Sequence, residues 1–432
     1  MDRDSTCPKQ NSWADIVSSQ RRYRGSHLVA AAQIEPIRTE PAPMHFAPEL
    51  LLLLACSQPE SDRESKLGMI LALPLDWDHL LRLADYHRLL PPLYSARHGR
   101  NDIPASIHSA MVARFERQAR RTLRFTAELA RILRQFDRHG IRALAHKGGA
   151  LGQLLYGDPA MRQFGDLDFL AQSADVPRAR AALQEIGYAP KIQLSPRQEK
   201  AYLRSGYEYV FGLNAERNLV EVQWQIVPRF YSIDFDMKAL FSRSIECDLD
   251  GLRLRTLGRE DLMLVLCLHA AKHEWAQLGM IRDITALARL ELDWRWIETE
   301  ARRLGIMRIL AVSLSLAGSL FSLELAVPTV LQQEIYQVTE IAAAMERRTI
   351  AGIEAETESL RYFRAMMRLR ERWQDRARLG LRLAATPSVG EWQSVRIPDS
   401  LFMLYRGVRM LRLLKRFCFP SKPHLVPSAP SE

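Results

Sequence analysis

A change of sequence pattern between residues 140 and 170 constrains the fold more than any other feature of the chain. The helical spacing of apolar residues stops there, and residues 141–145 form a short apolar run that leads into a glycine-containing turn. Residues 164–170, FGDLDFL, alternate as a half-buried strand does, so Asp166 and Asp168 point to one face of the strand. Short strands separated by a turn and a short helix indicate a small sheet in this part of the chain.

Further stretches downstream carry strand-like patterns. Residues 207–213 and 219–226 are rich in β-branched and aromatic side chains, and residues 214–218 between them have the composition of a turn. Residues 247–255 resemble a hairpin with Gly251 at its turn. Strands mixed with short helices indicate a small α/β or α+β core.

Helical patterns flank this core on both sides. Apolar residues in the segment 103–138 return at spacings of three or four, while arginines occupy another side of the same helix. From residue 259 onward the pattern is helical again. We therefore predict an α+β protein, mostly helical overall, with a small mixed β-sheet core flanked by N- and C-terminal helical segments. The predicted boundaries are a disordered leader at 1–44, a helical segment at 45–138, the core at 139–257, a helical domain at 258–418 and a flexible tail at 419–432.

Composition and charge restrict the classes of protein to which the chain can belong. Hydrophobic residues make up 47% and charged residues 25%, as in a globular protein, and the formal net charge of +10 favours anionic partners. Five scattered cysteines, with no CxxC pair, argue against a disulfide framework or a zinc knuckle and favour a reducing compartment. The N-terminus has no signal-peptide pattern, so we expect a cytoplasmic protein. The apolar runs at 48–56 and 309–327 predict buried helices and no membrane insertion, because the first is too short to span a bilayer and the second contains Glu324.

The paired aspartates stand out by their context and not by their spacing. A DxD pattern occurs five times in the chain, but only Asp166 and Asp168 lie within a convincing strand. One interpretation is a strand that faces solvent and happens to carry acids. The other is a metal site, because two adjacent carboxylates repel each other and a divalent cation such as Mg²⁺ or Mn²⁺ is the natural counter-charge. Glu221 is a third candidate ligand, because it shares one face of the 219–226 stretch with Gln223.

Gly148 and Gly149 lie where a strand passes into a helix. Free backbone amides and the helix dipole can hold a phosphate at such a point, and glycine lets the backbone come close. Lys147 and Arg162 are candidates for further positive charge near a triphosphate. The alternatives are a tight connection without a ligand, and basic side chains that are solvated or that brace a nearby aspartate.

Several of these residues together resemble the nucleotidyltransferase-fold superfamily. The resemblance rests on Lys147-Gly148-Gly149, YGDP at 156–159, Arg162, GDLDFL at 165–170 and GY at 187–188. Within the superfamily the chain is most similar to a family known mainly as uncharacterised nucleotidyltransferases, and its segments 76–84 and 269–275 resemble the flanking segments of that family. It is also similar to the abortive-infection nucleotidyltransferase toxins.

The resemblance implies a metal-dependent nucleotidyltransferase with magnesium, or manganese, as cofactor. In the superfamily the glycine turn holds the nucleoside triphosphate, a role that would fall here on residues 148–149. Two strand carboxylates bind two magnesium ions, a role that would fall on Asp166 and Asp168. A third carboxylate, here Glu221, helps to activate the acceptor hydroxyl. The enzyme would transfer a nucleoside monophosphate to a hydroxyl group of an acceptor. The acceptor is a small metabolite, a sugar, a peptide or an RNA end, and the sequence does not choose among these four.

The chain also departs from the superfamily pattern. It has a double glycine where glycine-serine is frequent, a long gap before Asp166, and a glutamate as third acid where aspartate is frequent. These departures keep open a second hypothesis, a catalytically silent nucleotide-binding or scaffold protein of the same fold.

His269 and His273 lie one helical turn apart and have three interpretations. They are packed in the core, or they contact the nucleotide or acceptor, or they bind zinc with Asp283 as third ligand and Glu274 as base. The order of the residues is not that of an HExxH metalloprotease. The basic side of the 103–138 helix is in turn either a solvated surface or a site for nucleic acid or a membrane surface.

Overall fold

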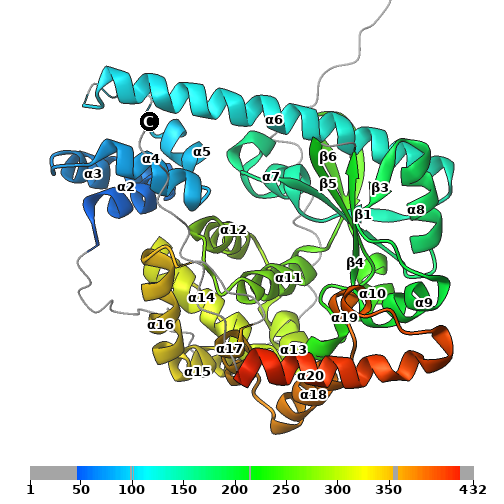
Figure 1. Cartoon of the computed structure of the whole chain (residues 1–432). Coiled ribbons are helices and arrows are strands. Elements are labelled where there is room, and N and C mark those ends of the chain that lie inside the picture. The colour runs from blue at the N-terminus through cyan, green and yellow to red at the C-terminus, as the bar shows by residue number, and fades with distance from the viewer. Residues whose placement is uncertain (1–45, 98–99, 101, 214–215, 354–358, 419–432) are drawn as a thin grey trace, which may run out of the picture. The chain divides into compact units, whose positions relative to one another are not determined.

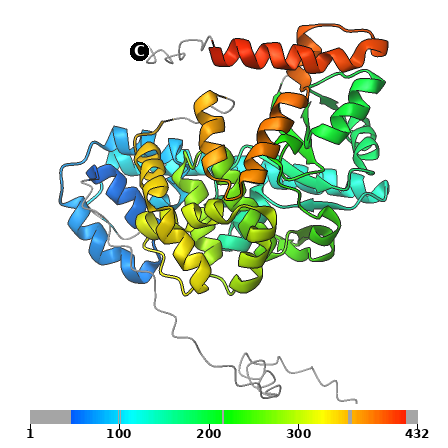
Figure 2. The ribbon, with the colours of Figure 1, turned by 90° about the horizontal axis from the view of Figure 1, so that it is seen from below.

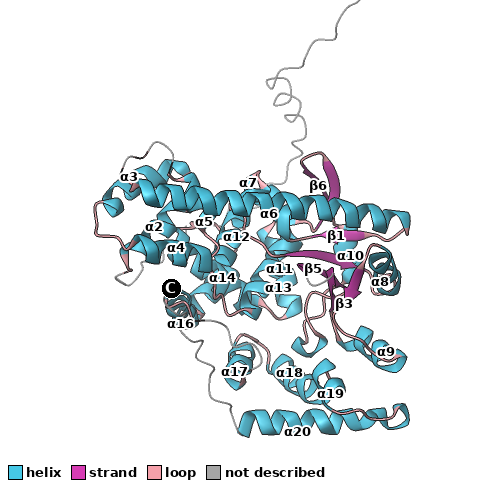
Figure 3. Cartoon of the chain, turned by 45° about the horizontal axis from the view of Figure 1, so that its top comes forward, coloured by secondary structure: helices cyan, strands magenta, loops and turns pink. Residues whose placement is uncertain are grey.

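The computed structural model describes residues 46–97, 100, 102–213, 216–353 and 359–418 of the 432. All of them belong to one compact unit, residues 36–432. The leader predicted at 1–44 and the tail predicted at 419–432 lie outside the described residues. Figure 3 shows helices through most of the chain and strands gathered in one region, and this confirms the predicted mostly helical α+β fold.

A five-stranded mixed sheet forms the centre of the predicted core. Its strand order is β1-β2-β5-β4-β3, in which β2 and β5 are parallel and the other neighbouring pairs are antiparallel. The strands are β1 (Ala143–Ala145), β2 (Asp166–Ala171), β3 (Tyr188–Pro190), β4 (Glu208–Leu213) and β5 (Glu216–Gln223). The turn predicted at 214–218 is therefore shorter than expected, because β5 already begins at Glu216.

A separate hairpin follows the sheet. It consists of β6 (Ile245–Leu249) and β7 (Leu252–Thr256), as the pattern at 247–255 predicts. Asp250 and Gly251 form its two-residue turn with φ of 52° and 82°, the backbone that a tight hairpin requires at both positions.

The helices of the core region pack around the sheet and the hairpin. They are α7 (Gly148–Tyr156), η2 (Pro159–Met161), α8 (Val176–Glu185), α9 (Pro196–Ser205), η3 (Arg229–Tyr231) and α10 (Met237–Ser242). The sequence pattern predicts α7 and α8 but neither α9 nor the three-residue strand β3.

Five helices of the described residues precede the sheet. They are α2 (Pro48–Cys56), α3 (Glu60–Leu71), α4 (Trp77–Tyr86), α5 (Leu90–Ser95) and α6 (Ala105–Arg138). The long helix α6 buries one apolar side against the sheet region, and its basic side keeps Arg117, Arg121 and Arg124 exposed. Arg131 instead donates to Glu128 and to the carbonyl of Ile186, so part of the basic side holds the fold together.

The helices after the hairpin extend to the end of the described chain. They are α11 (Arg259–Lys272), α12 (Leu278–Ala288), α13 (Trp294–Leu304), α14 (Met307–Phe321), α15 (Thr329–Gln337), α16 (Thr339–Ile350), α17 (Leu360–Arg368), α18 (Trp373–Ala385), α19 (Val389–Ser394), η4 (Asp399–Leu404) and α20 (Tyr405–Cys418). The first apolar run is buried in α2, as predicted, whereas the second is largely buried in α14 only as far as Phe321, and the part after this helix is partly exposed. Among the described helices, none combines the length and the apolar character that a bilayer crossing requires.

The sheet separates two hydrophobic clusters. Leu167 and Phe169 on one face of β2 pack in a cluster with Phe125 and Phe136 of α6. Leu170, on the opposite face of β2, joins the larger cluster formed by the helical segments. Figures 1 and 2 show α11, α12 and α14 between the N-terminal helices and the sheet. The face of β2 that carries Asp166 and Asp168 is thereby turned toward α11 and α12.

Candidate active site

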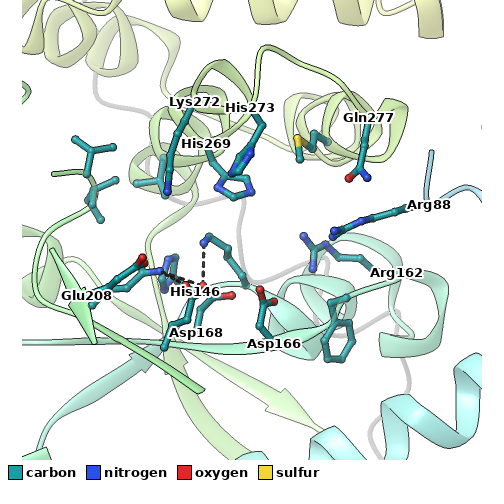
Figure 4. Close-up of a pocket in the computed structure, with 18 of the residues that line it drawn as sticks. Arg88, His146, Arg162, Asp166, Asp168, Glu208, His269, Lys272, His273 and Gln277 are labelled. Carbon is teal, nitrogen blue, oxygen red and sulfur yellow. Dashed lines mark hydrogen bonds and ion pairs between the residues drawn. The ribbon is translucent and has the colours of Figure 1, made fainter. Parts of the chain in front are cut away.

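A cavity of about 450 Å³ lies between the sheet and the helices that follow it. Its sheet side carries acidic and amide groups, namely Asp166, Asp168, Glu208, Glu221 and Gln223. The facing side comes from α11, α12 and their connection and carries His269, Lys272, His273 and Gln277. Figure 4 shows Asp166, Asp168 and Glu208 on one side of the cavity and His269, Lys272 and His273 on the other.

Strand register brings the predicted carboxylates together. Asp168 of β2 is the direct neighbour of Glu221 on the parallel strand β5, so both side chains stand on the same face of the sheet. Asp166 lies two residues before Asp168 and shares that face. Asp166, Asp168 and Glu221, which come from two strands that are distant in the sequence, therefore line one cavity.

Lysine and glutamine side chains hold the acids in this arrangement. Lys147 Nζ donates to Asp168 Oδ1 at 2.9 Å, and both side chains are largely buried. The Gln223 amide donates to the same oxygen of Asp168 at 3.1 Å and to Glu221 Oε2 at 3.0 Å. As the side chains stand, no three histidine, cysteine or carboxylate groups among the described residues are close enough to hold a metal ion together.

Burial and mutual repulsion shift the pKa values of the carboxyl groups in different directions. Burial and the negative charge of Asp168 raise the pKa of Glu221 to about 8, and they also raise the pKa of Asp166. Burial works in the same sense on Asp168, but the charge and hydrogen bond of Lys147, together with His146 and Arg162, outweigh it and hold the pKa of Asp168 below its usual value. The raised pKa values of Asp166 and Glu221 show that these two carboxyl groups are disfavoured as anions where they stand, which a bound cation would relieve.

The double glycine begins helix α7, as predicted. Lys147 is the N-cap, and Gly148 takes φ +58°, a left-handed conformation that favours glycine. Lys147 lines the cavity, whereas Gly148 and Gly149 are buried and are not among its lining residues. A phosphate would therefore meet Lys147 before it meets the backbone of the two glycines.

Arg162 lines the cavity but is engaged by an acid that lies far away in the sequence. Its Nε donates to Asp283 Oδ2 at 2.8 Å, and Tyr156 donates to Asp283 Oδ1 at 2.7 Å. Asp283 belongs to α12, so this contact ties the turn after α7 to the helical segment. The acid that braces Arg162 is thus Asp283.

His269 and His273 both line the cavity from α11 and its end. Their ring centroids are 4.8 Å apart. Burial lowers the pKa of His273 to about 4 and brings the pKa of His269 well below its ordinary value, with the neighbouring lysines acting in the same direction. Both rings are therefore neutral at pH 7 and can offer hydrogen bonds to a bound molecule without adding charge.

A zinc site at these histidines would need Asp283 as third ligand and Glu274 as base, and both are engaged by other residues. Both oxygens of Asp283 accept from Tyr156 and Arg162. Glu274, the suggested base, accepts from Arg348 at 2.7 Å. The two residues that a zinc site would need beside the histidine pair are thus engaged elsewhere.

The structure adds residues that the sequence interpretation leaves out. Glu208 stands opposite Gln223 on β4, and Lys272 donates to Tyr207 at 2.8 Å on the facing side of the cavity. Two signals in the sequence could have found these residues. Lys272 lies inside the HAAKHEW segment, close to His269 and His273, and Glu208 lies on the stretch 207–213, which has the period of a strand. Arg88 has no such signal, because it comes from a loop in the N-terminal helical segment.

Comparison with known proteins gives one result. The model of the uncharacterised nucleotidyltransferase family matches residues 74–322, more than half of the chain. Neither the curated proteins nor the solved structures contain a match. The matched region runs from the start of α4 to the end of α14 and includes every residue that lines the cavity. The resemblance seen in the motifs is confirmed, and the chain belongs to the uncharacterised nucleotidyltransferase family.

Proposed function

We propose that the protein is a metal-dependent nucleotidyltransferase that transfers a nucleoside monophosphate from a nucleoside triphosphate to a hydroxyl-bearing acceptor. One observation carries the proposal: Asp166, Asp168 and Glu221 line a single cavity on one sheet face, opposite a side that carries basic and imidazole groups. Membership of the nucleotidyltransferase family supports the same reaction class.

The donor set fits magnesium or manganese. Carboxylate oxygens are the ligands that these hard cations prefer, and Asp166, Asp168 and Glu221 supply them from two adjacent strands. Bound divalent cations supply charge neutralisation at the phosphate oxygens and orient the reacting groups. Lys147 provides positive charge to Asp168 through Oδ1, and a cation bound by Asp168 would compete with that ammonium.

The proposed reaction exchanges a phosphoanhydride bond for a phosphate ester bond. The acceptor oxygen bonds to the α-phosphorus, and the bond from that phosphorus to the bridging oxygen breaks. Pyrophosphate leaves with the electron pair, and the hydroxyl proton goes to water or to the ionised form of Glu221. The chain mainly positions the reactants: Arg162 is available to the phosphates, and the neutral His269 and His273 are available to the nucleotide or acceptor.

A second candidate is a catalytically silent nucleotide-binding or scaffold protein of the same fold. The observation that favours it is that Lys147 and Gln223 both occupy Asp168 Oδ1, so the acids are already satisfied in part by the chain itself. This candidate binds a nucleotide in the same cavity but transfers nothing.

The test offers labelled ATP, CTP, GTP and UTP, with magnesium or manganese and cell extract as acceptor pool, to the protein and to the Asp166→Asn, Asp168→Asn variant. We expect label transfer and pyrophosphate release with the unmodified protein, and a loss of about 100-fold or more in the variant, because several kcal/mol of charge stabilisation are removed.

The matched control is Asp234→Asn, Asp236→Asn. It removes the same charge from an exposed DxD pair, and asparagine keeps the cap that Asp236 makes at α10. The control should transfer as the unmodified protein does. Equal transfer by the site variant would refute the proposed mechanism, whereas nucleotide binding without transfer by the unmodified protein would establish the silent alternative.

A further inference from the structure

One part of the cavity wall comes from outside the sheet and α11. The last residue of α4, Tyr86, and the connection between α4 and α5, with Arg88, contribute to it. Arg88 adopts φ +58°, a left-handed conformation that is uncommon for residues other than glycine and costs about 1 kcal/mol. A strained conformation of this kind persists only where the surroundings impose it, and such conformations are enriched at functional sites.

The first turn of α12 imposes this conformation. Gly279 N donates to the carbonyl of His87 at 2.9 Å, and Leu278 N donates to His87 Nδ1 at 3.4 Å. A Cβ at position 279 would lie 2.9 Å from the His87 carbonyl oxygen and 3.1 Å from Arg88 Cβ, so only glycine allows this approach. The loop is thus pinned to the helical segment, and the direction of the Arg88 side chain is set by the tertiary structure.

The side chain of Arg88 points into the cavity beside Arg162. Figure 4 shows the two guanidinium groups near each other, on the Asp166 side of the cavity, with Glu208 at the opposite side. Arg162 is neutralised by Asp283 at 2.8 Å. No carboxylate among the described residues forms an ion pair with Arg88. The Arg88 side chain is exposed at the edge of the cavity, where partial desolvation and the positive charge of Arg162 lower its pKa and the charges of Asp166 and Asp283 act in the opposite direction.

We propose that Arg88 binds the phosphate tail of the nucleoside triphosphate. A guanidinium grips phosphate oxygens two at a time, and here it is held beside the acids that would bind the metal and beside a second arginine. The triphosphate then lies on the side of Asp166 and Arg162, and the side with Tyr207 and Lys272 is left to the other reactant. The inference rests on the proposed function and names a residue of the N-terminal helical segment as part of the nucleotide site.

The test compares Arg88→Gly with the unmodified protein in direct binding measurements. Glycine removes the guanidinium and also accepts φ +58° without strain, so the variant should be at least as stable to urea as the parent. The probes are a nucleoside triphosphate, the corresponding monophosphate and inorganic tripolyphosphate, titrated calorimetrically with magnesium. We expect affinity for the triphosphate and for tripolyphosphate to fall by about tenfold to a hundredfold, the effect of losing a charged hydrogen bond, and affinity for the monophosphate to stay within about twofold.

Two further variants make the result specific. Arg82→Ala removes the same charge from an exposed position on α4 and should bind all three probes as the parent does. Arg88→Asn keeps a residue that tolerates the left-handed conformation and should show the same loss as Arg88→Gly.

The possible failures are distinguishable. If Arg88→Gly binds triphosphate as tightly as the parent, or loses monophosphate and triphosphate equally, Arg88 does not hold the phosphate tail, while transfer by the parent still stands. If the parent binds no nucleotide, the proposed function itself fails, and this inference fails with it.

Discussion

The Lys147 ammonium lies 2.9 Å from Asp168 Oδ1, in a cavity wall where both side chains are largely shielded from water. The pair joins the residue that caps α7 to the centre of β2. It gives Asp168 a positive partner without a metal ion and keeps the pKa of its carboxyl group low. The ion pair therefore stabilises the ligand-free protein and competes with any cation for the same carboxylate.

Replacing Lys147 should expose this competition. In a buffer without divalent cations, Lys147→Met leaves a buried carboxylate unpaired and should lower the free energy of unfolding by about 3 kcal/mol. Manganese should then stabilise the variant more than the parent, because the cation replaces the missing ammonium. Urea denaturation with and without manganese measures both effects.

The control for this prediction is Arg142→Met, which removes the same charge from an exposed residue just before β1 and should cost less than about 0.5 kcal/mol. Equal stabilisation of Lys147→Met and the parent by manganese would contradict a competition for Asp168.

The left-handed glycine at the start of α7 leads to a prediction on stability and activity. Gly148→Ala should cost about 1 kcal/mol from backbone strain alone, since the new Cβ would meet Phe164 at an ordinary 3.5 Å. Gly140→Ala should cost a similar amount, because Gly140 has φ +61° and nothing within 4 Å. Only the change at 148 lies beside Lys147, so only that change should also reduce nucleotide transfer. Thermal unfolding and transfer assays on the two variants check this, and equal transfer rates would separate α7 from the site.

Buried histidines should make the protein labile to acid. The pKa of His87 is lowered from 6.5 to about 4 by burial, and its Nε2 has no hydrogen-bond partner among the described residues. Between pH 4 and 6.5 the unfolded chain therefore binds more protons than the folded one, so stability is fully present above pH 6.5 and is lost as the pH falls.

The variant His87→Asn isolates this contribution, because the asparagine oxygen can accept from Leu278 N as His87 Nδ1 does. From pH 7.5 to pH 5 the free energy of unfolding should fall by about 2 kcal/mol less in His87→Asn than in the parent. His108→Asn on α6 is the control and should keep the parental slope. An unchanged pH dependence in His87→Asn would mean that His87 is not buried in its neutral form.

Loss of the ion pair between Arg162 and Asp283 should strongly destabilise the protein. Asp283→Asn leaves a buried guanidinium without its counter-charge and should cost about 3 kcal/mol. Tyr156→Phe removes only one neutral donor to the same carboxylate and should cost about 1 kcal/mol. Chemical denaturation of both variants measures the difference, and equal costs would show that the charge of Arg162 is satisfied elsewhere.

The histidine pair gives a prediction on metal content. Because Asp283 and Glu274 are held by other residues, we expect His273→Ala to leave the zinc content of the purified protein unchanged and to reduce nucleotide or acceptor binding. Elemental analysis and binding titrations distinguish the two effects. Stoichiometric zinc that disappears with His273 would instead support the zinc site.

Local pattern was sufficient for much of the architecture. The period of two along residues 164–170 places Asp166 and Asp168 on one face whatever β2 pairs with, because alternation is a property of the extended backbone. The start of α7 at the double glycine and the hairpin turn at Gly251 follow in the same way from residues that favour particular backbone angles. Strand β3 has only three residues, too few for a period, so it escapes such a pattern.

The sequence by itself determined that two aspartates share a strand face, that a glycine turn opens a helix before them, and that helices surround a small sheet, since each of these depends on neighbours within a few residues. Only the tertiary structure decided that Glu221 stands beside Asp168, that Lys147 pairs with Asp168, and that Asp283 holds Arg162 from 121 residues away. It also decided that Arg88 enters the cavity, through a loop pinned against Gly279. Such contacts depend on how distant segments pack, and the energies of packing and of strand pairing are not written in the local period of either segment.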